Sequence, residues 1–288
     1  LCRTFALIWV RTMTATNSAH SRQPVLFLGH GSPMNAIEDN EFHQGWVKLG
    51  QAFAPEGRWP RPRLILCISA HWMTRGFRLT AMAQPRTIHD FGGFPQALFE
   101  QQYPAPGDPA WAARIAQAVR QPATGEPLML DDHEWGLDHG SWGVLKPMFP
   151  EADIPVIQLS VDMSRPATEH FALGRQLVSL RDEGVLIVAS GNTVHNLRVM
   201  QWSAYPDQAF EWTAEFDQWV AAQISAGKPE ALCDYAALGE TARLAHPSHE
   251  HYLPLLVAAG ATREDDAPSY FNDRFQAGSV AMRSVVWA

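Results

Sequence analysis

The sequence predicts an α/β protein with a single three-layer α/β/α domain around a central mixed, largely parallel sheet. Short apolar runs alternate along the chain with helical segments, which is typical of such layers. The 288 residues show no internal repeat, low-complexity stretch or linker that would divide them. We therefore expect an N-terminal extension over residues 1–24, poorly ordered in part, followed by one domain over residues 25–288.

The elements of this domain follow, in order, from the apolar and helical patterns. The predicted strands are five apolar runs at residues 25–30, 64–71, 154–161, 185–191 and 279–286. The predicted helices are three segments at residues 109–120, 166–182 and 209–224. Residues 85–109 are rich in glycine, proline and aromatic side chains, so we expect a loop that packs over part of the domain.

Composition argues against several classes of partner. The net charge is −8 and the lysines and arginines are scattered, so no basic surface for nucleic acid is indicated. No stretch approaches the roughly 18 apolar residues of a transmembrane helix, and the apolar run at residues 5–10 is too short for a secretion signal. Cys2, Cys67 and Cys233 are far apart and odd in number, which favours a reducing compartment. We expect a cytoplasmic protein, monomeric or a small homo-oligomer, with no nucleic-acid or membrane partner.

Three of the predicted strands lead into a histidine. His30 directly follows the first strand, His71 continues the second, and His195 comes four residues after the fourth. Because ligands gather at the carboxyl ends of strands in an open parallel α/β sheet, these side chains are expected to converge. Imidazole is the commonest protein ligand of divalent transition metals, so the pattern predicts a metal site. Taken singly, His30 could instead cap the turn that follows it, and His71 could be a histidine satisfied within the core.

A further ligand is expected from residues 246–251, the segment densest in histidine. Ser248 is predicted to cap a helix whose first turn carries residues 249–251. Only one or two of these side chains can face the metal, and their spacing does not match the His-Glu-x-x-His pattern of zinc proteases. His139 and His195 are additional candidates for the same mononuclear, histidine-rich site.

Six short motifs also occur in a fixed order along the chain. They read GHGSPMN (29–35), SAHW (69–72), TIHDFGGFP (87–95), DHGSW (138–142), SGNTVHN (190–196) and EHYLPL (250–255). In this order they resemble the class III extradiol ring-cleavage dioxygenases, and most of all the branch of the 4,5-DOPA dioxygenase type. The resemblance runs from about Val25 to the C-terminus, and six separate motifs make coincidence improbable.

The resemblance implies one non-haem divalent metal ion held by His30, His71 and His251. In the wider family the third ligand is a glutamate, so Glu250 is an alternative to His251. The family implies Fe(II) for catalysis, whereas zinc, which generally binds such sites more tightly, is expected to occupy the purified protein.

The resemblance further implies that the domain over residues 25–288 is catalytic and opens the ring of a DOPA-like catechol with O2. His195 is the expected acid–base catalyst, because a histidine can take and return a proton near neutral pH, and it is an occasional fourth ligand. His139 is the second choice for the catalytic role, its structural alternative being a buried histidine held by a carboxylate. His89 and Asp90 are expected to wall the pocket and contact the substrate.

Two other classes of function use the same residues. A zinc-dependent hydrolase would employ the three-histidine site with one open position to activate water. A protein that only binds a metal or a phenolic ligand would keep the pocket but would not need His195. Turnover of a catechol with oxygen consumption distinguishes the dioxygenase from both.

Overall fold

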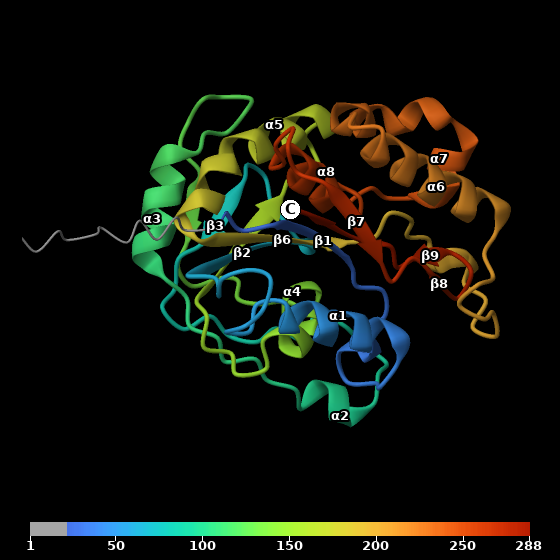
Figure 1. Ribbon diagram of the computed structural model, residues 1–288, viewed down its shortest axis with the longest axis horizontal. Helices are drawn as coiled ribbons and strands as arrows, with labels where there is room; N and C mark the ends of the chain where they lie inside the picture. The colour runs from blue at the N-terminus through green and yellow to red at the C-terminus, as the bar shows by residue number, and fades with distance from the viewer. Residues whose placement is uncertain (1–21) are drawn as a thin grey trace, which may run out of the picture.

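The computed structural model describes residues 22–288, and it confirms the three-layer α/β/α domain with a mixed, largely parallel sheet (Figure 1). Of the predicted extension over residues 1–24, residues 1–21 lie outside the described part of the chain. Residues 22–24 lead directly into the first strand. Within the described range, no helix is long and apolar enough to cross a bilayer.

Ten strands are present in the described chain. They are β1 (Val25–Gly29), β2 (Leu64–Met73), β3 (Arg78–Thr80), β4 (Met129–Asp131), β5 (Val156–Val161), β6 (Val185–Gly191), β7 (Pro268–Phe271), β8 (Phe275–Gln276), β9 (Val280–Ala281) and β10 (Ser284–Trp287). Eight of them form one sheet in the order β4-β3-β5-β2-β6-β1-β10-β7. The four central strands, β5, β2, β6 and β1, are parallel to their neighbours in this group. The carboxyl ends of β2, β6 and β1 therefore lie side by side.

Antiparallel strands flank this parallel centre. Strand β3 runs antiparallel to β5, β10 runs antiparallel to β1, and β7 runs antiparallel to β10. The single strand predicted at residues 279–286 is wrong, because β9 pairs with β8 in a separate two-stranded sheet and only β10 enters the main one. Backbone hydrogen bonds from Ala281 N to Val194 O and from Met282 N to Arg274 O hold the chain outside the main sheet until Ser284.

The helices of the described chain comprise eight α-helices and four 3₁₀ segments. They are α1 (Glu41–Gln51), α2 (Gln96–Phe99), α3 (Pro109–Ala118), α4 (His139–Met148), α5 (Ala167–Leu177), α6 (Glu211–Ser225), α7 (Glu240–Ala245), α8 (Leu253–Gly260), η1 (Pro33–Ala36), η2 (Val178–Glu183), η3 (Leu197–Val199) and η4 (Pro229–Leu238). The three predicted helices are confirmed as α3, α5 with η2, and α6. The loop predicted at residues 85–109 is confirmed as irregular chain interrupted only by the one-turn α2.

The helix predicted to start at Ser248 is wrong at its N-terminus. Helix α8 begins at Leu253, and the histidine-rich segment before it forms turns. Pro254 explains this boundary, because proline lacks the N–H that an interior helical position must donate and is accepted only in the first turn. The side chain of Ser248 donates to Glu250 rather than capping a helix.

The strands contribute alternate side chains to two hydrophobic layers. In β1, Val25 and Phe27 face one layer while Leu26 and Leu28 face the other. Helices α3, α5, α6, α7 and α8 cover the first face, and α1, α2 and α4 cover the second, as Figure 1 shows above and below the sheet. Both faces are therefore sealed, and the carboxyl edge of the parallel strands is left as the place where side chains can meet a ligand.

Candidate metal centre

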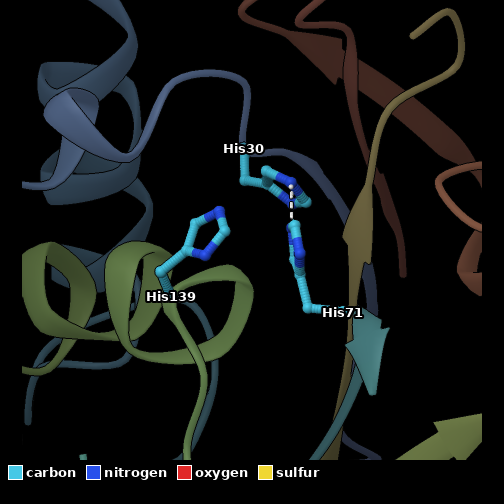
Figure 2. A group of neighbouring side chains, drawn as sticks. All are labelled: His30, His71 and His139. Carbon is cyan, nitrogen blue, oxygen red and sulfur yellow. Dashed lines mark hydrogen bonds between the residues drawn. The ribbon is translucent and has the colours of Figure 1, made fainter. Parts of the chain in front are cut away.

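Five histidines from separate elements meet at the carboxyl edge of the sheet. His30 follows β1, His71 is the third residue from the end of β2, and His139 is the first residue of α4. His195 comes four residues after β6, and His251 lies in the turn before α8. Figure 2 shows His30, His71 and His139 pointing toward one another from three different elements. The predicted convergence of the strand-end histidines is confirmed.

The rings of these histidines are in contact distance of one another. The Nε2 atoms of His30 and His71 are 3.1 Å apart. The ring centre of His251 lies 5.1 Å from that of His30 and 5.0 Å from that of His71. His195 stacks on His251 at 3.4 Å with an angle of 10° between the planes. The ring centre of His139 lies 4.0 Å from that of His71.

The hydrogen bonds around His30 define which of its nitrogens carries the proton. Its Nδ1 lies 2.9 Å from Ser190 Oγ. The hydroxyl of Ser190 donates its single proton to the carbonyl oxygen of Gly140, so it can only accept from His30. Nδ1 of His30 therefore carries the proton, and Nε2 faces the centre of the cluster with a lone pair.

His71 and His251 have carboxylates beside their outer nitrogens. Nδ1 of His251 is hydrogen-bonded to an oxygen of Glu250 at 3.0 Å, and Nδ1 of His71 lies 3.3 Å from an oxygen of Asp90 as an ion-pair contact without the alignment of a hydrogen bond. A carboxylate accepts a proton at Nδ1 and leaves Nε2 as a lone pair. An imidazole whose outer nitrogen donates to an acceptor in this way is typical of a metal ligand.

These partners make the cluster fit a metal ion. The Nε2 atoms of His30 and His71, 3.1 Å apart, share a hydrogen bond when one of them carries a proton (dashed line in Figure 2) and can bind one cation together when neither does. Imidazole nitrogens bind Zn²⁺ and similar ions at about 2.0–2.1 Å, so one ion can contact both Nε2 atoms. The possible ligand atoms of the cluster fall into two groups, and within each group they lie within 4.8 Å of one another. One group is His30, His71 and His139, and the other is His195, Glu250 and His251.

His30, His71 and His251 are neutral in this buried cluster. Burial lowers the pKa of His30 well below its usual value, and the positive charge that His71 would carry lowers it further. Burial and the neighbouring His139 lower the pKa of His71 to about 3. The pKa of His251 is likewise well below normal because of burial and the neighbouring His195. Neutral imidazole is the form that binds metals.

Asp90 lies between two of the histidines. Besides contacting His71, it accepts a hydrogen bond from the backbone N–H of His139 at 2.9 Å. The Nδ1 of His139 is 3.0 Å away from the same oxygen, without the alignment of a hydrogen bond. Burial alone would raise the pKa of Asp90, but hydrogen bonding by His139 and the positive charge that His139 and His71 would carry when protonated outweigh it and lower the pKa to about 2. Asp90 is therefore ionised, and it lines the cavity described below.

His89 does not join the cluster, although it precedes Asp90 directly. Its Nε2 lies 2.8 Å from the carbonyl oxygen of Gln101, and its ring contacts Phe91 and Trp142. The lining of the cavity includes Asp90 and Phe91 but not His89. Successive residues of extended chain point to opposite sides, so the two neighbours have separate surroundings.

Two supporting residues escaped the sequence reasoning. Ser190 is one, and Asp138, the N-cap of α4, is the other. The buried carboxylate of Asp138 accepts from Ser69 Oγ at 2.6 Å and from the amide of Gln158, and Ser69 in turn accepts from the backbone N–H of His71. Burial raises the pKa of Asp138, as does the nearby charge of Asp90. The only local signal was the Asp-His-Gly-Ser pattern of a helix start.

The absence of a side chain at Gly191 brings the turn with His251 against the end of β6. The backbone N–H of Asn192 donates to His251 O at 2.9 Å. A Cβ on Gly191 would lie 2.2 Å from that same carbonyl oxygen, which is closer than any real contact. Glycine at position 191 therefore permits the close approach that places the imidazole of His251 beside His30 and His71.

The histidine cluster opens onto a cavity of about 530 Å³. All five histidines line its inner part, together with Asp90 and Glu250. Two apolar segments contribute to its walls, Phe91 with Phe94 and Leu197 with Met200 and Trp202, and residues 31–33, Gln276 and Val280 complete them. The cavity volume falls in the range of small-molecule sites and accommodates a substituted aromatic ring.

The histidine cluster lies at the carboxyl edge of an α/β/α sheet and opens onto the cavity, and a protein with this fold and site belongs to the class of aromatic ring-opening dioxygenases. Residues 24–281 match the family of the catalytic LigB subunit of aromatic ring-opening dioxygenase. A 4,5-DOPA dioxygenase extradiol of Escherichia coli K12 is 47% identical over 268 residues, covering 92% of this chain and 94% of the relative. A protein of the same description from Beta vulgaris is 37% identical over 262 residues, covering 90% and 94%.

A solved structure is similar as well. The crystal structure of an uncharacterized protein from Escherichia coli K12 superimposes with a TM-score of 0.77 at 42% identity, covering 93% of this chain and 100% of that one. The chain belongs to the class III extradiol dioxygenase family and is an extradiol aromatic ring-opening dioxygenase. The resemblance seen in the six sequence motifs is confirmed.

Proposed function

We propose that this enzyme is a non-haem, Fe(II)-dependent dioxygenase that opens the ring of a DOPA-like catechol with O2. The observation that carries the proposal is the 3.1 Å approach of the Nε2 atoms of His30 and His71 in the lining of the cavity. His251 is the third proposed ligand, because its ring lies about equally far from both and its Nδ1 is oriented by Glu250. Glu250 is thereby a positioning residue rather than a ligand.

Bound Fe(II) would supply open coordination positions for the two catechol oxygens and for O2, together with the electron transfer between them. In the overall reaction both oxygen atoms of O2 enter the product, and the ring bond between a hydroxyl-bearing carbon and its unsubstituted neighbour breaks. A proton leaves a catechol hydroxyl and one is returned later. The protein must therefore hold the ring in the cavity and move a proton at its edge.

His195 is the residue proposed to move that proton. It lines the cavity and stacks on His251, so its ring lies beside the proposed ligands. His139 is proposed to contact the catechol or act as a second acid–base group, held by Asp90. Asp90 is proposed to position His71 and His139 at the pocket wall. His89 is proposed to support that wall from outside the cavity, in place of the expected substrate contact.

Oxygen uptake tests the proposal. The protein is reconstituted anaerobically with Fe(II), its iron content is verified, and a panel of catechols including DOPA is added with O2. We expect one O2 consumed per catechol and a yellow ring-opened product. No uptake by iron-loaded protein with any catechol would contradict the proposal and favour the zinc hydrolase, which uses the same three histidines. Zinc in protein as purified would agree with either, so verified iron loading is essential.

Replacing His195 separates catalysis from metal binding. We expect His195→Ala to retain the metal, because His30, His71 and His251 remain, and to lose at least about a hundredfold in ring cleavage, as for removal of an acid–base group. Metal content by elemental analysis and turnover by oxygen uptake measure the two properties. The control is His133→Ala, which removes an exposed histidine outside the cavity. Full activity in His195→Ala would rule out the assigned role.

A further inference from the structure

The charged side chains that line the cavity, among the described residues, are carboxylates and histidines. Asp90 and Glu250 both face it, with 17% and 14% of their side chains exposed. The described lining contains no lysine or arginine. A ligand in this cavity therefore meets two anionic groups and, apart from the cluster itself, no permanent cation.

Arginines close to the cavity in sequence are directed elsewhere. Arg198 lies beside lining residues, but it borders a separate surface cavity together with Arg243. Arg274 donates to the carbonyl oxygen of Pro206. Arg283 is held on both oxygens of the Asp217 carboxylate. The guanidinium groups of Arg274 and Arg283 are therefore held by other partners, and Arg198 borders the separate cavity.

Two apolar segments contribute to the walls of the cavity. Leu197, Met200 and Trp202 follow His195 on one side, and Phe91 and Phe94 stand on the segment after Asp90. Trp202 is 75% exposed and Leu197 57% exposed, which is unusual for large apolar side chains and leaves their surface available to a ligand. Residues 31–33, Gln276 and Val280 complete the lining, so with the catechol oxygens at the histidines a ring substituent extends along a surface that carries no lysine or arginine.

We propose that the site selects catechols by the charge of the ring substituent, taking neutral or cationic substituents and disfavouring carboxylates. This inference rests on the proposed function, because that function sets the catechol oxygens at the histidines. A carboxylate beside these apolar segments loses hydration, finds no cation and is repelled by Asp90 and Glu250. An ammonium is attracted by the same carboxylates and stacks favourably on the ring of Trp202. A zwitterion such as DOPA stands between the two.

Binding to zinc-loaded protein tests this selection without turnover. Three catechols of similar size are compared by calorimetry in oxygen-free buffer: 4-(2-aminoethyl)catechol, 4-propylcatechol and 3-(3,4-dihydroxyphenyl)propionate. We expect the acid to bind roughly tenfold more weakly than the amine, the size expected of repulsion from two partly solvated carboxylates. Equal or tighter binding of the acid would overturn the inference.

Oxygen uptake by the iron-loaded protein with the same three compounds keeps the two proposals apart. The expected order of binding without any ring cleavage would contradict the proposed function and leave the charge selection standing. Cleavage of all three compounds with the acid preferred would contradict the charge selection and leave the proposed function standing. Failure of all three to bind would count against both.

A matched pair of variants tests the cause. Met200→Lys places a cation on the apolar wall, and Met200→Gln changes the same side chain without adding charge. We expect Met200→Lys to bind the acid about tenfold more tightly than the parent protein does and to remove the preference for the amine. Met200→Gln should keep the order of the three ligands. An unchanged order in folded, zinc-loaded Met200→Lys would show that charge does not select the substituent.

Discussion

Ser190 binds no ligand itself, yet its hydroxyl determines the proton position on His30. It accepts from Nδ1 of His30 and donates to Gly140 O, which links the end of β6 to the first turn of α4. Hydrogen-bond partners of this kind orient a metal-binding imidazole and raise its basicity. The identity of the residue at position 190 should therefore matter for metal affinity.

We expect Ser190→Ala to lower metal affinity by roughly 10–100-fold, because His30 loses its orienting partner. The affinity is measured by competition with a chromogenic chelator. The control is Ser160→Ala, which removes a buried hydroxyl of β5 that bonds Thr74 and the backbone of Arg78 instead of a histidine. If both variants bind metal as tightly as the parent protein, Ser190 has no such role.

Some of these residues could be predicted from the sequence and others could not. His30 and His71 could, because each ends an apolar run and parallel strands end together. Ser190 could not, because its bonds to His30 and Gly140 join segments distant in the sequence, and no local pattern records them. Asp90 was expected to wall the pocket and contact the substrate; it lines the cavity, and its contacts with two histidines are a feature that the sequence did not indicate.

At the scale of the element, the turn before α8 is the feature that the sequence described least well. Ser248 stands before the histidine-rich segment as an N-cap residue would. Pro254, however, is accepted only in the first turn of a helix, and α8 accordingly begins at Leu253, the residue before it. The resulting turn packs on β6 through Gly191. Local rules predicted that a helix starts here, and the tertiary contact with β6 determines how the preceding residues are arranged.

Gly191→Ala tests that packing. Its methyl group would collide with His251 O, so we expect a loss of about 1–3 kcal/mol in the free energy of unfolding and weaker metal binding. Urea unfolding and chelator competition measure the two effects. Gly143→Ala in α4 is the control, because its Cβ would meet only Ala36 at an ordinary 3.7 Å and alanine favours a helix. Equal stability of Gly191→Ala and the parent would contradict the close approach.

At the scale of the whole molecule, a buried histidine outside the metal centre links stability to pH. In His170, Nδ1 donates to Pro166 O, and Nε2 accepts from the backbone N–H of Asp162. Burial lowers the pKa of His170 to about 4, the bond to Pro166 and the charge of Asp162 oppose this, and His249 adds to it. The folded protein therefore holds this side chain neutral where the unfolded chain takes up a proton.

The folded pKa of His170 is below the unfolded value of about 6.5, so its contribution to stability is full above pH 6.5 and declines as the pH falls toward 4. We expect the free energy of unfolding of metal-free protein to drop between about pH 7.5 and pH 5. His170→Gln, which cannot take up that proton, should show a shallower decline in urea unfolding. A variant with the parent's slope would exclude His170 as a source of the pH dependence.

The strand order has a consequence for how this protein is made. Strand β1 is the first strand of the described chain, yet its two neighbours in the sheet are β6 and β10. During synthesis on the ribosome, the apolar run of β1 emerges early and has no partner on either edge until far later residues appear. Unpaired edges of this kind are prone to aggregate, and such distant pairing folds slowly. Synthesis through β6, rather than any early folding nucleus around β1, therefore sets when the carboxyl ends of β1, β2 and β6 can come together.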